Sequence, residues 1–317
     1  MRLIRTFLAL TTWAWFSLAG FAAEHGAHAA EAAAHAEHAS EGLPTAAPVL
    51  FHVGPLPVTN SMVVTWAVAL LLVLAVRVAT KDMQMVPRGA QNFWEWLVEG
   101  LYEFIEGIIG AELVKKTFWF FATVFLLIVT TNWFGLLPGV GTIGYGIPTE
   151  PGGHNLAHVT DPFLRGANAD FNMTFAMSMV FFVCWTVWAI QSNGIGGFLK
   201  HIFAPKGDTK GPLFVLMVVV FFAVGLLEIV SIMFRPVSLS FRLYGNIFAG
   251  ENMLEAMTHL GGPVFGWLTS LPFYFMELMV GIVQAMVFTL LTAVFTLLIC
   301  AHDEEQAHEP GAAHPHH

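Results

Sequence analysis

Two long apolar stretches near the end of the chain constrain its fold more than any other feature. The first covers residues 211–258 and the second covers residues 263–301. At about 1.5 Å per helical residue they would measure roughly 70 and 60 Å, whereas the hydrocarbon core of a membrane is about 30 Å thick. We therefore expect two membrane helices that tilt strongly, bend or break, with Pro236 as the natural break in the first.

Three shorter apolar segments complete the expected membrane part. Residues 61–80, 117–137 and 171–191 each match the run of about 20 apolar residues that a transmembrane helix needs. Only 11% of the residues are charged, whereas a soluble domain has about 25%. The sequence therefore predicts an all-α polytopic membrane protein with about five membrane-crossing segments. It has no basic patch or motif that would favour nucleic acid as a partner.

The segment between the first two spans has a different pattern. In residues 91–110 four acidic side chains recur at helical spacing on one face, and aromatic and aliphatic residues occupy much of the rest: Glu95, Glu99, Glu103 and Glu106. This pattern predicts an amphipathic helix at the membrane interface. Because its polar face is acidic, we expect it to contact protein rather than lipid headgroups.

The two ends of the chain are predicted to lie outside the membrane domain. Residues 1–22 have the basic start, apolar core and small residues of a signal peptide, although a retained transmembrane helix is the alternative. Residues 23–50 and 306–317 are His-rich, and we interpret them as solvated tails, with metal binding as the alternative. No spacing typical of a closed metal site occurs, so no metal or cofactor is expected. Residues 51–305 form the predicted membrane domain.

Basic residues predict the orientation in the membrane. The connection covering residues 138–170 contains Arg165 as its one lysine or arginine. By the positive-inside rule this connection lies outside, which places the mature N-terminus outside and the C-terminus inside. The opposite connections hold the remaining basic residues near the spans: Arg77, Lys81, Arg88, Lys115, Lys116, Lys200, Lys206 and Lys210.

Arg242 lies about halfway along the first long stretch, where a charge is least expected. A charged residue deep in a bilayer costs at least ~2.5–3.5 kcal/mol and is usually functional. Carboxylates and an amide accompany it in the same two stretches, namely Glu228, Glu251, Glu277 and Gln284. A cation together with carboxylates inside the membrane favours an ion or proton path.

The residues around Arg242 also resemble a known family. Residues 234–251 (FRPVSLSFRLYGNIFAGE) closely resemble the signature of subunit a of the F-type ATP synthase membrane sector. Shorter matches follow the same order along the chain, so that the resemblance covers residues from about 50 to 305. They are TNWFGLLP at 131–138, ADFNMT at 169–174, GIGGF at 194–198 and VQAMVF at 283–288. The N-terminal extension resembles those of some bacterial members only.

The resemblance implies a stator in the cytoplasmic membrane of a bacterium that does not bind nucleotide itself. Its implied partners are the c-ring, subunit b of the peripheral stalk, the remaining ATP synthase subunits and the lipid bilayer. The last two helices are implied to lie strongly tilted along the c-ring. Protons would reach the ring carboxylates through one half-channel and leave through a second half-channel on the other side of the membrane.

Within that mechanism Arg242 is implied to face the ring carboxylate and to block direct proton passage between the half-channels. A guanidinium suits this role because it stays charged at any physiological pH. Glu251 and Glu277 are candidate proton carriers of the outer half-channel. The family often has a histidine at one of these two positions, whereas this chain has glutamate at both. Which of them titrates therefore stays open, and the pair can share one proton.

Further polar residues are candidates for the same path. Gln284 is expected to face Arg242 and to hold its side chain by a hydrogen bond, and Asn246 shares the helix face of Arg242.

Asp170 and Asn172, at the outer end of the third span, are candidates for the outer vestibule. Glu228 is a candidate for the exit path, with contact to water as the alternative. His259 is a candidate for proton relay near the outer turn, with an exposed turn histidine as the alternative.

A secondary transporter in which Arg242 binds an anionic substrate is the alternative function. Transporters of that kind often contain paired internal repeats with broken helices, and no convincing repeat is visible here. A non-conducting membrane scaffold would leave the intramembrane charges unexplained. The size of the c-ring, the choice between H⁺ and Na⁺ and the direction of the reaction are not encoded in any pattern of this chain.

Overall fold

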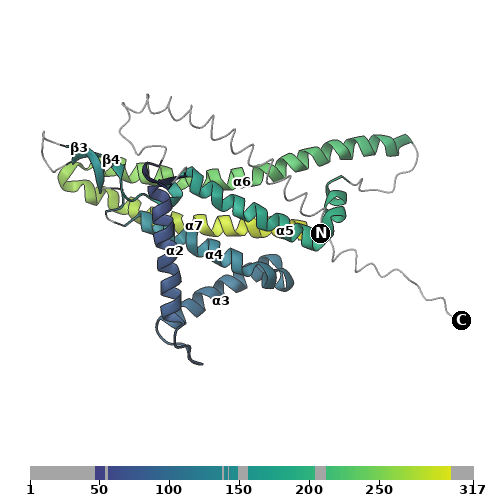
Figure 1. The fold of residues 1–317 in the computed structure, drawn as a ribbon, viewed down its shortest axis with the longest axis horizontal. Coiled ribbons are helices and arrows are strands. Elements are labelled where there is room, and N and C mark those ends of the chain that lie inside the picture. Colours follow the sequence, from purple (N-terminus) through teal and green to yellow (C-terminus); the bar gives the residue numbers. More distant parts are fainter. Residues whose placement is uncertain are drawn as a thin grey trace. The chain divides into compact units, whose positions relative to one another are not determined.

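The computed structural model describes residues 47–53, 56–137, 139–141, 143–148, 156–203 and 212–300. The signal peptide expected at 1–22, most of the tail at 23–50 and the tail at 306–317 lie outside the described residues. Within the described part the chain is predominantly helical (Figure 1). The helices are α2 (Asn60–Ala79), α3 (Ala90–Ile109), α4 (Ala111–Gly135), α5 (Phe171–Phe203), α6 (Pro212–Leu260) and α7 (Gly262–Cys300).

The prediction of an all-α polytopic membrane protein is confirmed. Five of the described helices, all except α3, are long and apolar enough to cross a membrane. Two short antiparallel hairpins, which the sequence did not predict, lie before α2 and between α4 and α5. They are β1 (Val49–Val53) with β2 (Leu56–Thr59), and β3 (Gly144–Pro148) with β4 (Leu156–Pro162).

Helix α3 is the amphipathic helix expected at residues 91–110. It buries Leu101, Ile105 and Ile109, whereas Glu99 and Glu103 are exposed. The buried residues recur every four positions, so one stripe of the helix packs against the protein. This stripe belongs to the same hydrophobic core as residues of α4, α5, α6 and α7.

The core owes much of its packing to aromatic side chains between α4 and α5. Phe120 and Phe121 of α4 both contact the Trp188 ring of α5, with centroid distances of 5.7 and 6.0 Å. Phe120 also lies 6.1 Å from Phe181, which is 1% exposed. Aromatic pairs at these distances add about 0.5–1.5 kcal/mol to the burial of their surface. This packing fixes α5 beside α4 and thereby places the start of α5 near the candidate site.

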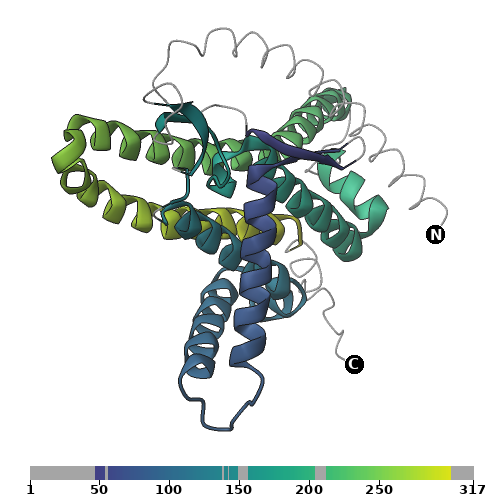
Figure 2. The same cartoon turned by 60° about the vertical axis from the view of Figure 1, so that its left-hand side comes forward.

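Helices α6 and α7 form the long antiparallel pair on which most candidate residues lie. They run side by side and join at their tip, whereas α2 lies across their direction (Figures 1 and 2). The break expected at Pro236 is not present, because α6 continues through this residue. Proline removes one backbone hydrogen bond there. Contacts to α5 and α7 support the helix on either side, which is the physical reason for its continuity.

Helix α5 contains the clearest departure from helical geometry. Gly194 has φ 68° and ψ 169°, a conformation that belongs almost only to glycine, and it separates two helical parts. The Asn193 side chain donates a hydrogen bond of 2.7 Å to the backbone oxygen of Ile299 on α7. The bend in α5 is therefore fastened to the last turn of α7.

Candidate functional site

Arg242 lies on an exposed face of α6 together with Asn246. The residues on the adjacent face of this helix segment are buried in the core: Leu239, Leu243 and Ile247. A guanidinium exposed to hydrocarbon is costly. The part of the chain that the structure describes leaves this face of α6 uncovered at Arg242.

Gln284 of α7 bonds Asn246 and not Arg242, contrary to the expectation from sequence. The Asn246 Nδ2 donates to Gln284 Oε1 at 2.7 Å. Gln284 is 4% exposed, and its Nε2 has no hydrogen-bond partner among the described residues. The expectation is wrong because Asn246, one turn farther along α6, occupies the position opposite Gln284.

The structure brings the two candidate carboxylates, Glu251 and Glu277, to neighbouring positions. The Glu277 carboxylate lies directly against Gly250, the residue before Glu251, so that a Cβ at Gly250 would collide with it. Glu277 is only 5% exposed, and its Oε1 has no hydrogen-bond partner among the described residues. The carboxylates of Glu251 and Glu277 are close enough to interact electrostatically. A buried pair of this kind is suited to sharing a proton.

Gly166 makes room for the Glu251 side chain, and Gly135 lies in ordinary contact with it. Its Oε1 lies so close to Gly166 that a Cβ there would collide with it, and a Cβ at Gly135 would lie 3.6 Å from the same oxygen. Gly135 ends α4, and Gly166 precedes the short 3-10 helix η2 (Ala167–Ala169). The carboxylate of α6 is therefore held between the end of α4 and the connection that leads to α5.

Arg165 is the residue that the sequence analysis missed. It was counted as an outer-loop charge, yet its side chain is only 1% exposed. The guanidinium carbon lies 5.9 Å from the centre of the Phe248 ring, and its charge interacts with Glu251. The available signal was its position as the one arginine or lysine of the 138–170 connection, directly before Gly166.

Asp170 fastens the start of α5 to α2. It is 4% exposed, its Oδ2 accepts a hydrogen bond of 2.5 Å from Ser61 Oγ, and its Oδ1 accepts one of 3.0 Å from the Asn172 backbone N–H. The second contact caps the first turn of the helix. The Asn172 side chain is exposed. The structure thus gives Asp170 a structural role at the start of α5.

A second set of buried amides extends this polar region toward α7. Asn168 donates to Thr131 Oγ1 at 2.8 Å and to Asn132 Oδ1 at 2.6 Å. Asn132 in turn donates to the backbone oxygen of Gly281 at 3.1 Å. The connection that carries Arg165 and Gly166 is therefore tied to both α4 and α7.

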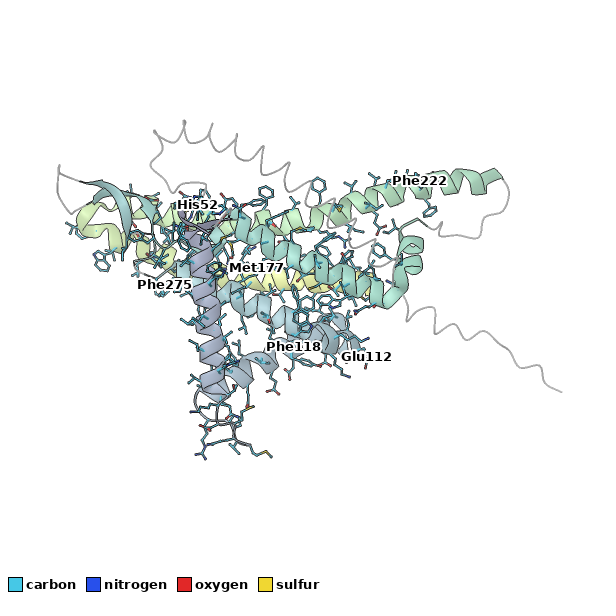
Figure 3. All side chains as sticks on the ribbon, viewed as in Figure 1. His52, Glu112, Phe118, Met177, Phe222 and Phe275 are labelled. Carbon is cyan, nitrogen blue, oxygen red and sulfur yellow. The ribbon has the colours of Figure 1, made fainter. Side chains whose placement is uncertain are left out.

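Two other candidates lie apart from the carboxylate pair. Glu228 is half-buried on α6, fourteen residues before Arg242, and its charge interacts with Arg235. His259 lies near the tip of the α6–α7 pair with a 73% exposed side chain, 3.9 Å from Glu255. In Figure 3, Phe222 on α6 and Phe275 on α7 lie toward opposite sides of the helix pair. No cluster of three or more potential metal ligands occurs in the described part of the chain.

Comparisons with known proteins point to one family. The family model described as ATP synthase A chain matches residues 62–296. The chain is 31% identical to ATP synthase subunit a of Gloeobacter violaceus over 246 residues, which cover 77% of this chain and 85% of that relative. It is 28% identical to ATP synthase subunit a of Moorella thermoacetica over 246 residues, covering 78% and 93% of the two chains. It is 32% identical to ATP synthase subunit a 1 of Pelobacter propionicus over 236 residues, which cover 74% of this chain and 85% of that relative.

Proposed function

Because the chain belongs to the ATP synthase A chain family, we propose that it forms the two proton half-channels that serve the c-ring, with Arg242 as the barrier between them. The family makes it a multi-pass membrane component of the proton-translocating sector of ATP synthase. The assembly with a c-ring, subunit b and the peripheral stalk is part of the proposal, as are the roles of individual residues.

The arrangement of charges along α6 is the observation that carries this proposal. Arg242 is exposed on one face, and nine residues later Glu251 lies within electrostatic range of Glu277 of α7. Nine helical residues correspond to about 13 Å along the axis. The helix therefore presents a permanent cation to a partner and a pair of proton-exchanging groups within a short distance of it.

The outer half-channel is assigned to the carboxylate pair and its neighbours. Protons from outside bind at Glu251 and Glu277 and pass toward the ring near the Asn246–Gln284 contact. Two observations support this route. The buried Glu277 Oε1 and Gln284 Nε2 lack protein partners among the described residues, and buried polar atoms normally have a partner, which can be water. Arg165, whose charge interacts with Glu251, joins the carboxylate pair to the connection that is assigned to the outside.

Arg242 acts on the ring carboxylate that arrives beside it. Its positive charge favours the ionised form of that carboxylate, so the proton departs toward the inner half-channel. The same charge repels protons and prevents a direct leak between the half-channels. Each leaked proton would lose roughly 2.3 kcal/mol per 100 mV of membrane potential. Lysine would be a poorer barrier, because it loses its proton more readily when it is desolvated.

The inner half-channel is assigned to the first half of α6. Glu228 lies there on a half-buried face and is the nearest carboxylate candidate on that side of Arg242. With the mature N-terminus outside and the C-terminus inside, this part of α6 is on the cytoplasmic side. The basic residues near that side support the orientation.

Replacing Arg242 tests the proposal. We expect Arg242→Ala to abolish ATP synthesis and ATP-driven proton pumping in membrane vesicles, because the ring carboxylate loses its counter-charge. The amount of this subunit in the purified complex should stay unchanged, since Arg242 is exposed and makes no hydrogen bond within the described residues. Arg88→Ala, at an exposed site between α2 and α3, is the matched control and should pump normally. Normal pumping by a fully assembled Arg242→Ala complex would refute the assignment.

A further inference from the structure

Helix α6 contacts α7 on both sides of Arg242, and the two contacts have the same alignment of the helices. Toward the outside Asn246 bonds Gln284, and toward the inside the Arg235 guanidinium lies over the Phe295 ring. Eleven residues separate Arg235 from Asn246 on α6, and eleven separate Gln284 from Phe295 on α7. Arg242 therefore lies on a segment that is fastened to the same neighbouring helix at two equivalent positions.

The inner contact joins three helices. The Arg235 guanidinium carbon lies 4.6 Å from the centre of the Phe295 ring of α7 and 5.6 Å from that of the Trp185 ring of α5. Trp185 is 2% exposed, and its Nε1 donates a hydrogen bond of 2.9 Å to the backbone oxygen of Phe295. This hydrogen bond holds Trp185 beside Phe295, independently of the contact that both rings make with the guanidinium. Cation–π contacts of this kind are strongest when the groups are desolvated.

This contact lies where α6 is weakest. Pro236, the next residue, has no backbone N–H and removes one hydrogen bond from the helix. Proline sites are where long helices commonly kink. A cation gripped from two neighbouring helices resists both bending and rolling of α6 at this point.

We propose that Arg235 is a positioning residue that, through Trp185 and Phe295, pins the Arg242 segment of α6 on its inner side. The Asn246–Gln284 hydrogen bond pins the same segment on its outer side. This inference rests on the proposed role of Arg242 as the cation that faces the rotor. A roll of α6 by one residue would turn Arg242 by about 100° around the helix axis and away from the ring. A stator helix under load from a rotor needs such fixed points.

Arg235→Gln and Arg235→Lys in the intact ATP synthase test the proposal. The readout is the ratio of protons pumped to ATP hydrolysed in inverted membrane vesicles. Arg235→Gln removes the cation, and we expect the ratio to fall by at least about threefold, whereas Arg235→Lys keeps a cation over the rings and should stay within about twofold of the wild type. An unchanged ratio in Arg235→Gln, or an equal loss in Arg235→Lys, would overturn the proposal.

Phe295→Leu removes the ring and leaves the arginine. We expect it to lower the ratio, and we expect the double variant with Arg235→Gln to be no worse than the more severe single variant, because both changes remove one interaction. Phe275→Leu, at a 66% exposed phenylalanine of the same helix, is the control and should be neutral. If Arg235→Gln does not assemble, Phe295→Leu tests the proposal by itself. A normal ratio in Phe295→Leu rejects the positioning role of Arg235, and a lowered ratio supports it.

The variants also separate this inference from the proposed function. If Arg242→Ala abolishes pumping while Arg235→Gln and Phe295→Leu pump normally, the proposed function stands and the positioning role of Arg235 is wrong. If a fully assembled Arg242→Ala complex pumps normally, the proposed function fails, and the positioning role of Arg235 fails with it.

Discussion

The carboxylates of the candidate site lie where glycines leave room for them. Glu277 contacts Gly250, and Glu251 contacts Gly166. Neither contact leaves space for a methyl group, so the site depends on the absence of a side chain as much as on the presence of the acids.

Gly166→Ala tests this dependence. The new Cβ would collide with Glu251 Oε1, so the end of this flexible side chain must shift. We expect slower proton pumping, because the carboxylate must move from its position beside Arg165 and Gly135. The measurement is the initial rate of ATP-driven acidification in membrane vesicles. Gly107→Ala, where a Cβ on α3 meets nothing within 4 Å, should keep the normal rate. Equal rates in the two variants would contradict the tight fit.

Individual helices owe their course to a few special residues. Helix α6 continues through Pro236, whereas α5 is interrupted at Gly194. Proline therefore does not interrupt this helix, because neighbouring helices hold it on both sides. Glycine at a position with φ 68° and ψ 169° does interrupt its helix, because almost no other residue adopts that conformation.

Gly194→Ala and Gly196→Ala form a matched pair on α5. Alanine at residue 194 is strained by about 1–3 kcal/mol, so the detergent-solubilised complex should lose this subunit at a lower temperature. At residue 196 a Cβ meets nothing within 4 Å, and alanine favours a helix over glycine by about 0.5–1 kcal/mol. We therefore expect Gly196→Ala to be neutral or stabilising. The temperature at which half of the subunit is released from the heated complex measures the effect of both variants. Equal release temperatures would contradict the interpretation of the bend at Gly194.

At the scale of the whole membrane domain, hydrogen bonds at the start of α2 hold the connection between α4 and α5 in place. Ser61 bonds Asp170, and Asn60 donates a hydrogen bond of 2.8 Å to the backbone oxygen of Pro162. These contacts fix the connection that carries Arg165 and so hold its charge beside Glu251. Because α2 lies across α6 and α7, an upright α2 implies that the long pair is strongly inclined in the bilayer (Figures 1 and 2).

The orientation can be checked by cysteine labelling. In a variant in which Cys184 and Cys300 are replaced by alanine, Met85→Cys places a thiol at a fully exposed site between α2 and α3, and Ile143→Cys places one at a 60% exposed site between α4 and α5. We expect a membrane-impermeant maleimide to label Ile143→Cys from outside and Met85→Cys only in inverted vesicles, because the basic connections stay inside. Labelling of either thiol from the opposite side would reverse the orientation.

The sequence by itself determined the membrane class, the helical fold and the family. These follow from local quantities: the length of each apolar segment, the spacing of acids in α3 and the residues around Arg242. They require no knowledge of how one helix lies against another. The β-hairpins escaped prediction because they lie outside the apolar segments, in parts of the chain where turn chemistry, and not apolar length, sets the structure.

Only the tertiary structure decided which side chains meet. Whether Arg242 or Asn246 reaches Gln284 depends on the axial rotation and register of α6 against α7, and a shift of one turn exchanges the two residues. Arg165 looked like a surface charge because its burial arises from packing against Phe248, a residue more than eighty positions away. Helix rotation and long-range burial are set by the sum of many side-chain contacts, so no single stretch of sequence contains them.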